Sequence, residues 1–447
     1  MQPNIIKHLC RTFLALILFV QSAFGGTEEL PKSDAPAWKD ISIGEYHLSI
    51  GGTYRLRYEF QDEYDIKKYG TGDHENFLLS RFRLNFDFKF RNLKAFVQFQ
   101  DARVFGSPFD DSDFNLSNPY HDVMDIRQAY VDYDAGENLE VMLGRQEIEF
   151  ADRRIFGPGN WGNTGRYVWD AARLRYHNSL IDSHFLAGRY IIADPDRWPN
   201  KHASGPTAYA NYTMIKNLPF DFDVFYVLKR DDHGNTQGEK GEGNLTSHSL
   251  GFRVDGTIGR WDYGTTFVRQ FGRWGSDSLR SYGLATRLGY TLDCPWSPHF
   301  MVQFINGSGD DDPRDGIKGT FDGVFGGADT VLYGWMNMFF WSNTREYRLD
   351  LILSPAENIS FRGEYHYFTL DEKKDAWYFP GNAQRRDMSG TSGRELGHEV
   401  DITFHYMPVK WFDIMGGYCF FVPGEFIGKT GPDPLTQWVF LQTEISF

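Results

Sequence analysis

The sequence has few cysteines and no excess of positive charge. Three cysteines occur in 447 residues, and Cys10 precedes the first apolar run, which leaves Cys294 and Cys419 for the rest of the chain. Two cysteines cannot frame a fold of this length, so a disulfide scaffold is excluded. The formal net charge of -14 argues against nucleic acid as a partner, because such a surface needs a basic excess.

Long hydrophobic runs are also missing, with one short exception at the N-terminus. Lys7 and Arg11 precede an apolar run from Phe13 to Val20, and small residues follow up to Gly26. The run is too short to span a bilayer, and its flanks are typical of a secretory signal peptide rather than of a buried helix in a cytosolic domain. We therefore predict a cleaved leader at residues 1–25 and one mature domain at residues 26–447.

What the mature chain does contain is alternation of apolar and polar residues. Between positions 78 and 90 most of the even positions are apolar, while the odd positions from 81 to 89 are polar or charged. A helix would scatter these residues around its circumference, so a period of two predicts strands. The same period appears at residues 53–60, 172–177, 250–255, 359–367 and 400–406.

Composition and the C-terminus narrow the kind of β protein. Aromatic residues make up 17% of the chain and glycines number 46, which suits a membrane barrel with aromatic girdles but also a soluble sandwich or propeller. The last segment, Trp438 to Phe447, is amphipathic and ends in Phe, and it resembles the assembly signal of outer-membrane barrels. The alternating segments predict an all-β fold, a single transmembrane antiparallel β-barrel of about 16–18 strands.

Two kinds of connection separate the alternating segments. Arg91-Asn92 and His177-Asn178-Ser179 are short turns. Longer polar segments, which in such barrels lie on the extracellular side, are predicted at residues 106–122, 193–206, 231–247, 306–330 and 371–396.

Arginine is frequent on the polar side of the strands. An arginine facing lipid at the bilayer midplane costs about 2–4 kcal/mol, so these side chains should face the lumen, where rings of arginine favour anions and bind carboxylates with two hydrogen bonds. Alternatively, they pair with lumenal Glu59, Asp87, Asp255 and Glu364 and only stiffen the wall. The arginines are Arg55, Arg57, Arg81, Arg83, Arg173, Arg175, Arg253 and Arg362.

The densest group of charged and glycine residues lies between Leu143 and Arg175. It predicts a strand that leaves the wall, a Gly-Pro-Gly loop that folds into or over the pore, and a returning strand that begins near Asp170. The orientation of Arg145 stays open, because Val141 and Leu143 share its register.

This block resembles the bacterial outer-membrane alginate-export family. The matching motifs are Gly144 to Glu147, Asp152-Arg153-Arg154, Gly157-Pro158, Trp161 with Asn163 to Arg166, and Asp170 with Arg173, and shorter ones continue to Gly431. The resemblance implies an 18-stranded monomeric barrel whose arginine-lined constriction passes a uronic-acid polymer and is partly gated by loops. The residues it implies for the pore are Arg81, Arg83, Arg103, Arg127, Arg145, Arg153, Arg154, Arg166 and Arg173, with Asp152 and Asp170 as acidic partners.

Three functions remain open at this stage. The first is a passive outer-membrane channel for anionic polysaccharide or oligosaccharide, in contact with outer-membrane lipid and fed by periplasmic export partners. The second is a less selective porin for small anionic solutes, and the third is a barrel enzyme or adhesin that acts through long loops. We expect no enzyme, cofactor or metal site, since histidines lack ligand spacing and Pro313 interrupts the calcium-like segment Asp310 to Gly316, which should be a solvated loop.

Overall fold

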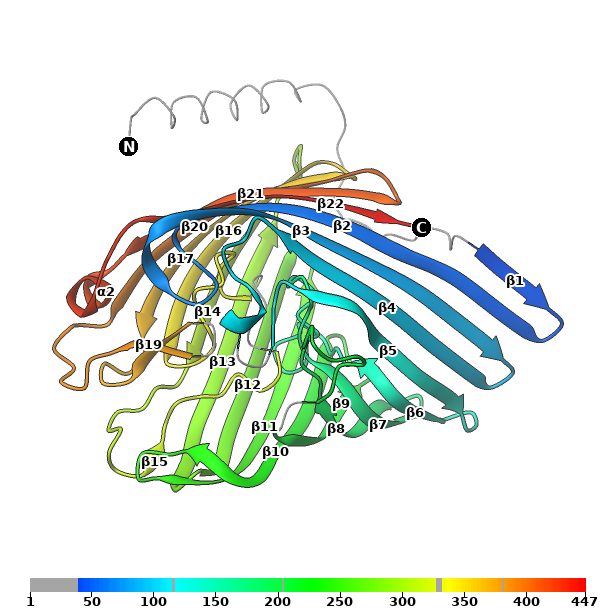
Figure 1. The fold of residues 1–447 in the computed structure, drawn as a ribbon, viewed down its shortest axis with the longest axis horizontal. Helices are drawn as coiled ribbons and strands as arrows, with labels where there is room; N and C mark the ends of the chain where they lie inside the picture. The colour runs from blue at the N-terminus through cyan, green and yellow to red at the C-terminus, as the bar shows by residue number, and fades with distance from the viewer. Residues whose placement is uncertain (1–38, 115–116, 203–204, 327–331, 380–381) are drawn as a thin grey trace.

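The computed structural model describes residues 39–114, 117–202, 205–326, 332–379 and 382–447, so the predicted leader lies outside the described residues. One sheet of 20 strands closes on itself where β2 (Tyr46–Tyr64) pairs with β22 (Thr436–Ser446) (Figure 1). Two of its strands, β1 (Lys39–Ile43) and β15 (Ile317–Lys318), are short. The other eighteen form a closed antiparallel barrel, which confirms the predicted fold.

The wall strands follow one another in chain order. Between β2 and β22 they are β3 (Tyr69–Phe90), β4 (Leu93–Phe105), β5 (Asp122–Asp134), β6 (Leu139–Glu147), β7 (Val168–His177), β8 (Ile181–Tyr190), β9 (Thr207–Ile215), β10 (Asp221–Gln237), β11 (Glu242–Ile258), β12 (Trp261–Trp274), β13 (Asp277–Thr291), β14 (His299–Gly307), β16 (Thr344–Ala356), β17 (Ile359–Leu370), β20 (Glu395–Val409) and β21 (Phe412–Pro423).

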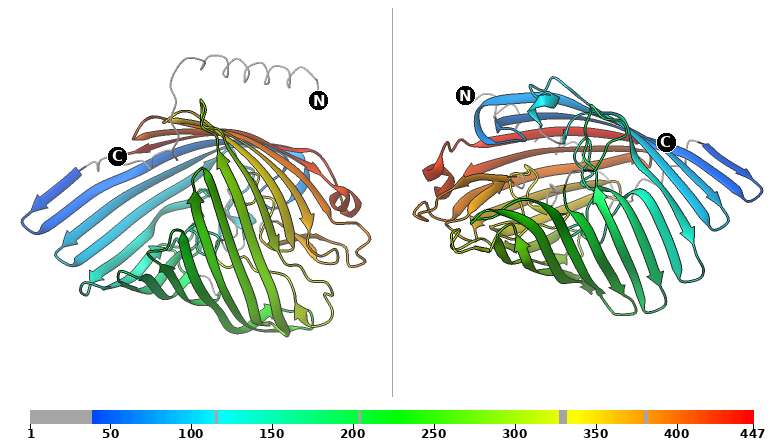
Figure 2. Two further views of the ribbon diagram at one scale, coloured as in Figure 1. Left: turned by 180° about the vertical axis from the view of Figure 1, so that it is seen from behind. Right: turned by 60° about the horizontal axis from the view of Figure 1, so that its bottom comes forward.

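The two ends of the barrel differ. Short turns, including the predicted Arg91-Asn92 turn between β3 and β4, lie at the end that carries β1 and the C-terminus. The opposite end carries longer connections, which contain η1 (Asp111–Asp113), the hairpin of β18 (Ala376–Phe379) and β19 (Asn382–Arg386), and α2 (Glu425–Thr430) (Figures 1 and 2). In barrels of this type the short turns face the periplasm and the long loops face outward.

Side chains alternate across the wall as the sequence predicts. Along β11, Leu250 is 54% exposed on the outer face, while its neighbours Ser249 and Gly251 face inward and are buried. At the short-turn end, the Trp261 and Tyr290 rings are in tilted contact on the outer face with ring centroids 4.6 Å apart. An apolar outer face bordered by aromatic residues is the pattern that a lipid environment requires.

One predicted loop is wrong. Residues 231–247 were expected to be a long connection, but β10 runs to Gln237 and β11 begins at Glu242. Beyond the apolar outer band both faces of these strands meet water, so no apolar residue is needed at alternate positions and the period of two disappears from the sequence.

The connection between β14 and β16 also differs from the expectation of an extracellular loop at residues 306–330. Its described residues from 319 to 343, here the second inner loop, turn into the barrel and bury Phe321, Phe339 and Trp341. Residues 148–167, here the first inner loop, turn inward as predicted. Phe156 and Phe325 form a parallel bridge between the two loops, and the Phe325 N–H donates to the Ile155 carbonyl at 3.1 Å. The two loops therefore narrow the lumen from opposite sides.

Candidate functional site

Five arginines of the inner wall gather beside the first inner loop. Arg55 and Arg57 come from β2, Arg81 and Arg83 from β3, and Arg127 from β5, and each is at most 9% exposed. Arg55 and Arg81 are directly opposite each other in the β2–β3 ladder. Like charges in that position destabilise a sheet unless other groups compensate.

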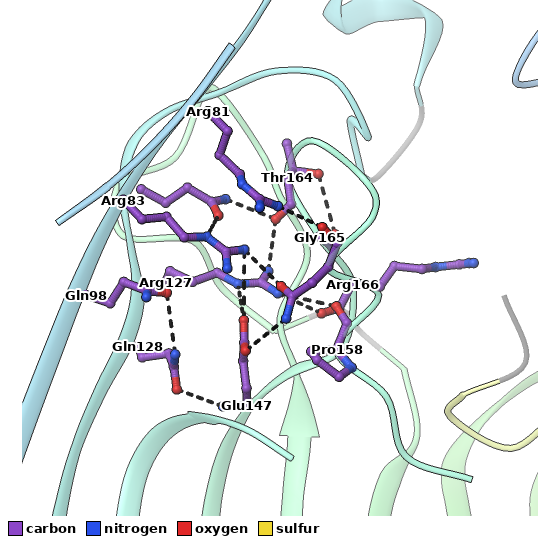
Figure 3. Close-up of polar contacts among 12 residues, drawn as sticks. Arg81, Arg83, Gln98, Arg127, Gln128, Glu147, Pro158, Thr164, Gly165 and Arg166 are labelled. Atoms are coloured by element: carbon purple, nitrogen blue, oxygen red, sulfur yellow. Dashed lines mark hydrogen bonds and ion pairs between the residues drawn. The ribbon is translucent and has the colours of Figure 1, made fainter. Parts of the chain in front are cut away.

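The compensation comes from backbone carbonyls of the first inner loop. The Asn160 carbonyl accepts from Arg55 Nη1 at 3.1 Å and from Arg81 Nη1 at 2.8 Å. The Trp161 carbonyl accepts from Arg57 Nη1 at 2.7 Å. Arg127 donates to the carbonyls of Thr164 and Pro158 at 2.9 and 3.3 Å, so four guanidinium groups of the cluster bind backbone carbonyls of the loop, and the fifth, Arg83, binds the Asn160 side chain (Figure 3).

Carboxylates balance only part of the charge. Arg57 Nε lies 2.7 Å from Glu59, and Arg127 Nε lies 3.0 Å from Glu147. Glu444 is 3.4 Å from Arg81. Because carbonyl oxygens carry no net charge, the cluster of five arginines and three carboxylates stays positive.

Local backbone features bring Arg127 and the loop together. The β4–β5 register shifts between Gln98 and Phe99, which is a bulge of the kind that re-aims a side chain. Gly165 then passes so close that a Cβ there would lie 2.5 Å from Arg127 Nη2, and its φ is +76°. Only glycine fits this approach.

A second part of the wall, formed by β17 and β20, holds the second inner loop through carboxylates instead of guanidinium groups. Glu399 accepts the Met336 N–H at 2.9 Å, and Asp401 accepts the Trp335 N–H at 3.2 Å. The Trp335 indole N–H donates to Glu364. These carboxylates are at most 3% exposed, so buried acids bind the N–H groups of one loop while buried arginines bind the carbonyls of the other.

Aromatic contacts join the loops to each other. The Trp161 and Trp335 rings meet edge to face with centroids 5.2 Å apart, and Arg57 lies over Trp161 at 4.3 Å. Arg154 lies over Tyr333 at 5.5 Å, and its Nε is 3.0 Å from Asp152. Such pairs add about 0.5–1.5 kcal/mol each beyond the area that they bury.

A cavity of about 470 Å³ lies beside this junction, on the side of the loop-rich end. Arg57, Lys67, Trp161, Arg166 and Trp335 are among its lining residues. Arg166 is exposed and points away from the arginine cluster (Figure 3). Its guanidinium has one described contact, at 5.5 Å from the Tyr167 ring centroid. The volume falls in the range of small-molecule sites.

The remaining predicted residues fall into two groups. Arg173 faces the lumen below the cluster, and Arg362 faces it on β17, 2.9 Å from Asp350. Arg153 is 2.7 Å from Glu149 in the first inner loop.

Three predicted pore residues lie on the outer side of the wall instead. Arg103 pairs in register with Ser80, one position away from inward-facing Arg81, and is bound by Asp101 at 2.8 Å. Arg145 shares the face of Leu143, which is 54% exposed, and lies 2.9 Å from Asp170. The alternation of side chains along each strand turns Arg103, Arg145 and Asp170 outward, so these three residues do not line the lumen.

Residues of the second inner loop and its acidic wall were not among the predicted site residues. A signal was present, because Glu399 and Asp401 occupy alternate positions on a strand whose other face carries Val400 and Ile402. Charged groups that face the lumen at such positions need partners, and the partners here are backbone N–H groups that no side-chain pattern reveals.

At the loop-rich end, two carboxyl groups from different connections between strands lie close together. Glu239 follows β10 and faces Asp310 after β14, and it accepts the Gly316 N–H at 2.9 Å. Burial, with Asp310 and Asp277 nearby, raises the pKa of Glu239 to about 7. Burial and Asp375 also raise the pKa of Asp310.

We expect this contact to weaken as the pH rises. A carboxyl whose pKa is raised in the folded loop binds its proton more tightly there than in the free loop, so the contact loses stability between the ordinary glutamate pKa of about 4.3 and about 7. Tryptic cleavage after Arg314, normalised to a peptide of the same sequence, should be faster at pH 8 than at pH 6. Glu239→Gln should remove the difference, and an unchanged pH ratio in the variant would contradict the assignment.

No described helix is long and apolar enough to cross a membrane. Residues 46–439 match the family model described as alginate export. No curated protein sequence matches the chain.

Solved structures from Pseudomonas aeruginosa share the fold. OpdQ is 10% identical with a TM-score of 0.58, over 89% of this chain and 98% of that chain. OccK11 (OpdR) is 12% identical with a TM-score of 0.55, over 89% and 96%. OccK2 (OpdF) in complex with glucuronate is 9% identical with a TM-score of 0.57, over 90% and 98%.

Proposed function

The chain belongs to the alginate export family and forms an outer-membrane channel, and we propose that this channel passes an anionic polysaccharide or oligosaccharide of the alginate type. The observation that carries the proposal is the positively charged cluster of Arg55, Arg57, Arg81, Arg83 and Arg127 beside the narrowed lumen. The cargo is recognised by charge, and the channel performs no chemistry on it.

The arginines would act at a distance rather than by direct binding. Four of them donate N–H groups to loop carbonyls, but hydrogen bonding to a neutral oxygen leaves each positive charge in place. A charge about 8 Å from the path, at an effective dielectric constant of about 40, attracts an anion by about 1 kcal/mol. Several such contributions concentrate an anionic chain in the lumen, yet each is weak enough to release it.

Direct contact with cargo would fall to the cavity beside the loops. Arg166 offers an exposed guanidinium, which binds a carboxylate with two hydrogen bonds. Trp161, which is half-buried, lines the same cavity and gives it an aromatic surface suited to the C–H faces of sugar rings. A uronate unit carries both features, a carboxylate and an apolar ring face.

A porin for small anionic solutes is the second candidate. Two inner loops meet in the lumen, which favours a small cargo. OccK2 (OpdF), which shares the fold, is described in complex with glucuronate, a single uronate. If this candidate holds, monomeric uronate should pass, whereas longer oligomers should neither block nor cross.

Arg166→Gln is the test, measured as anion-to-cation permeability and block by oligouronates in planar bilayers. We expect permeability ratio and block affinity to fall about two- to fivefold, because one exposed lumenal charge contributes up to about 1 kcal/mol. Arg103→Gln is the matched control, since it removes an exposed arginine from the outer face and should change neither quantity. A cation-selective channel, or equal effects in both variants, would refute the proposal.

A further inference from the structure

Three arginines form a patch on the outer face of the barrel near its loop-rich end. Arg269 and Arg273 lie on β12, where they alternate with the buried, inward-facing Gln270 and share the outer face with Phe271. Arg280 lies on β13 directly opposite Phe271. It is therefore diagonal to both other arginines, with Cβ separations of about 7–8 Å.

None of the carboxylates in the described part of the chain neutralises this arginine patch. Among the residues that the structure describes, none lies within ion-pair distance of Arg269, Arg273 or Arg280. Elsewhere on the outer surface arginines have acidic partners, as Arg230 has in Asp232 at 2.8 Å and Arg91 has in Glu45 at 2.6 Å. In a chain with a net charge of -14, three unpaired neighbouring cations call for an external anion.

The height of the patch matches the outer boundary of the membrane. Arg269 is eight residues beyond the girdle residue Trp261, which at a rise of about 3.3 Å per residue and a tilt of about 40° places it roughly 20 Å above the short-turn end. Arg273 lies roughly 30 Å above it by the same reasoning. The apolar band of such barrels is about 25 Å tall, so the patch spans its outer edge, where an arginine costs little.

An apolar groove lies on the same outer face, closer to the short-turn end than the patch. It has a volume of about 670 Å³ and is lined by outward-facing side chains of β13, β14, β16 and β17, among them Leu288, Val302, Phe304, Tyr347 and Leu349. On β13, Leu288 is on the same face as Arg280, closer to the short-turn end. Leu288 is eight residues from Arg280, roughly 20 Å lower at the same rise and tilt, so apolar outer surface continues below the cations. Cations at the membrane edge above an apolar surface are complementary to a lipid with an anionic headgroup.

We propose that Arg269, Arg273 and Arg280 bind the phosphate groups of a phosphorylated glycolipid of the outer leaflet, whose acyl chains lie along the apolar outer face below the patch. Phosphate monoesters suit three clustered guanidiniums because each offers several acceptor oxygens, and arginine binds phosphate with two hydrogen bonds. The site is on the opposite side of the wall from the lumen and is independent of the cargo.

The test is retention of diphosphoryl lipid A by the purified protein, measured by native mass spectrometry against dephosphorylated lipid A and phosphatidylglycerol. We expect the wild type to prefer the diphosphoryl form at least about tenfold, and the triple variant R269Q/R273Q/R280Q to lose that preference. The control variant R91Q/R103Q/R260Q removes the same charge from exposed arginines elsewhere and should keep it.

Three results would overturn the site: no preference in the wild type, equal loss in both variants, or binding of phosphatidylglycerol as strong as that of lipid A. If the triple variant does not fold, Arg273→Gln and Arg280→Gln are measured singly, and each should reduce the preference. Channel conductance should be unchanged in every variant that folds.

Discussion

Replacing Trp335 by alanine is expected to widen the channel. The side chain is 3% exposed, its indole N–H donates to Glu364, and its ring stacks on Phe440 with centroids 5.7 Å apart. Truncation of a buried tryptophan costs about 3–5 kcal/mol, which here would be lost from the docking of the second inner loop rather than from the ladder of the wall. Single-channel conductance should rise several-fold.

Trp198→Ala is the control for that change. Trp198 lies in the connection between β8 and β9, is 66% exposed and donates to the Met124 carbonyl at 2.9 Å, far from the inner loops in the chain. Its removal should leave conductance unaltered. If Trp335→Ala behaves in the same way while the barrel stays folded, the second inner loop does not limit the pore.

Arg127→Ala should have the second large effect, on both selectivity and current fluctuations. The side chain donates to the carbonyls of Pro158, Thr164 and Arg166 and lies 3.0 Å from Glu147. Leaving buried partners without their cation costs about 3–5 kcal/mol. We expect the first inner loop to loosen, the open-channel noise to increase and the anion preference to fall.

Arg127→Lys separates the two effects. Lysine keeps the charge, but its single ammonium group cannot bind the three carbonyls and the carboxylate that the planar guanidinium of arginine binds together. The lysine variant should therefore retain most of the anion preference and show the noise of the alanine variant. Equal selectivity loss in both variants would mean that geometry, and not charge, governs permeation.

Strand periodicity predicted the wall well. Every alternating segment, from residues 53–60 to the last strand, lies within a strand of the barrel, and the inward turn of residues 157–165 was also expected. These predictions succeed because a wall between lipid and water imposes a period of two on each strand that crosses it.

Strand periodicity predicted neither the second inner loop nor the orientation of Arg145. Segment 332–343 is held by backbone N–H groups that donate to Glu399 and Asp401. Because nearly every residue has the same backbone N–H group, the sequence does not show which of them will be bound. Arg145 follows Gly144, whose φ is +124°, near the point where β6 leaves the wall, and its guanidinium donates there to the Asn200 carbonyl of the β8–β9 connection at 2.6 Å. An outward-facing arginine that contacts polar groups instead of lipid carries no energetic penalty, so the sequence pattern does not reveal its orientation.

The first inner loop also touches both sides of the seam where the barrel closes. Arg55 and Arg57 on β2 bind its carbonyls, and the Trp161 ring contacts Trp438 and Phe440 on β22 at 6.1 and 5.2 Å. The ring of strands thus shuts around a segment from the first 40% of the chain, and in a barrel sealed without it lumenal water would have to replace the loop carbonyls as acceptors for these guanidinium groups. Because the loop contacts both strands of the seam, its docking should stabilise the closed barrel, and loosening of the loop should weaken the closure as well as widen the channel.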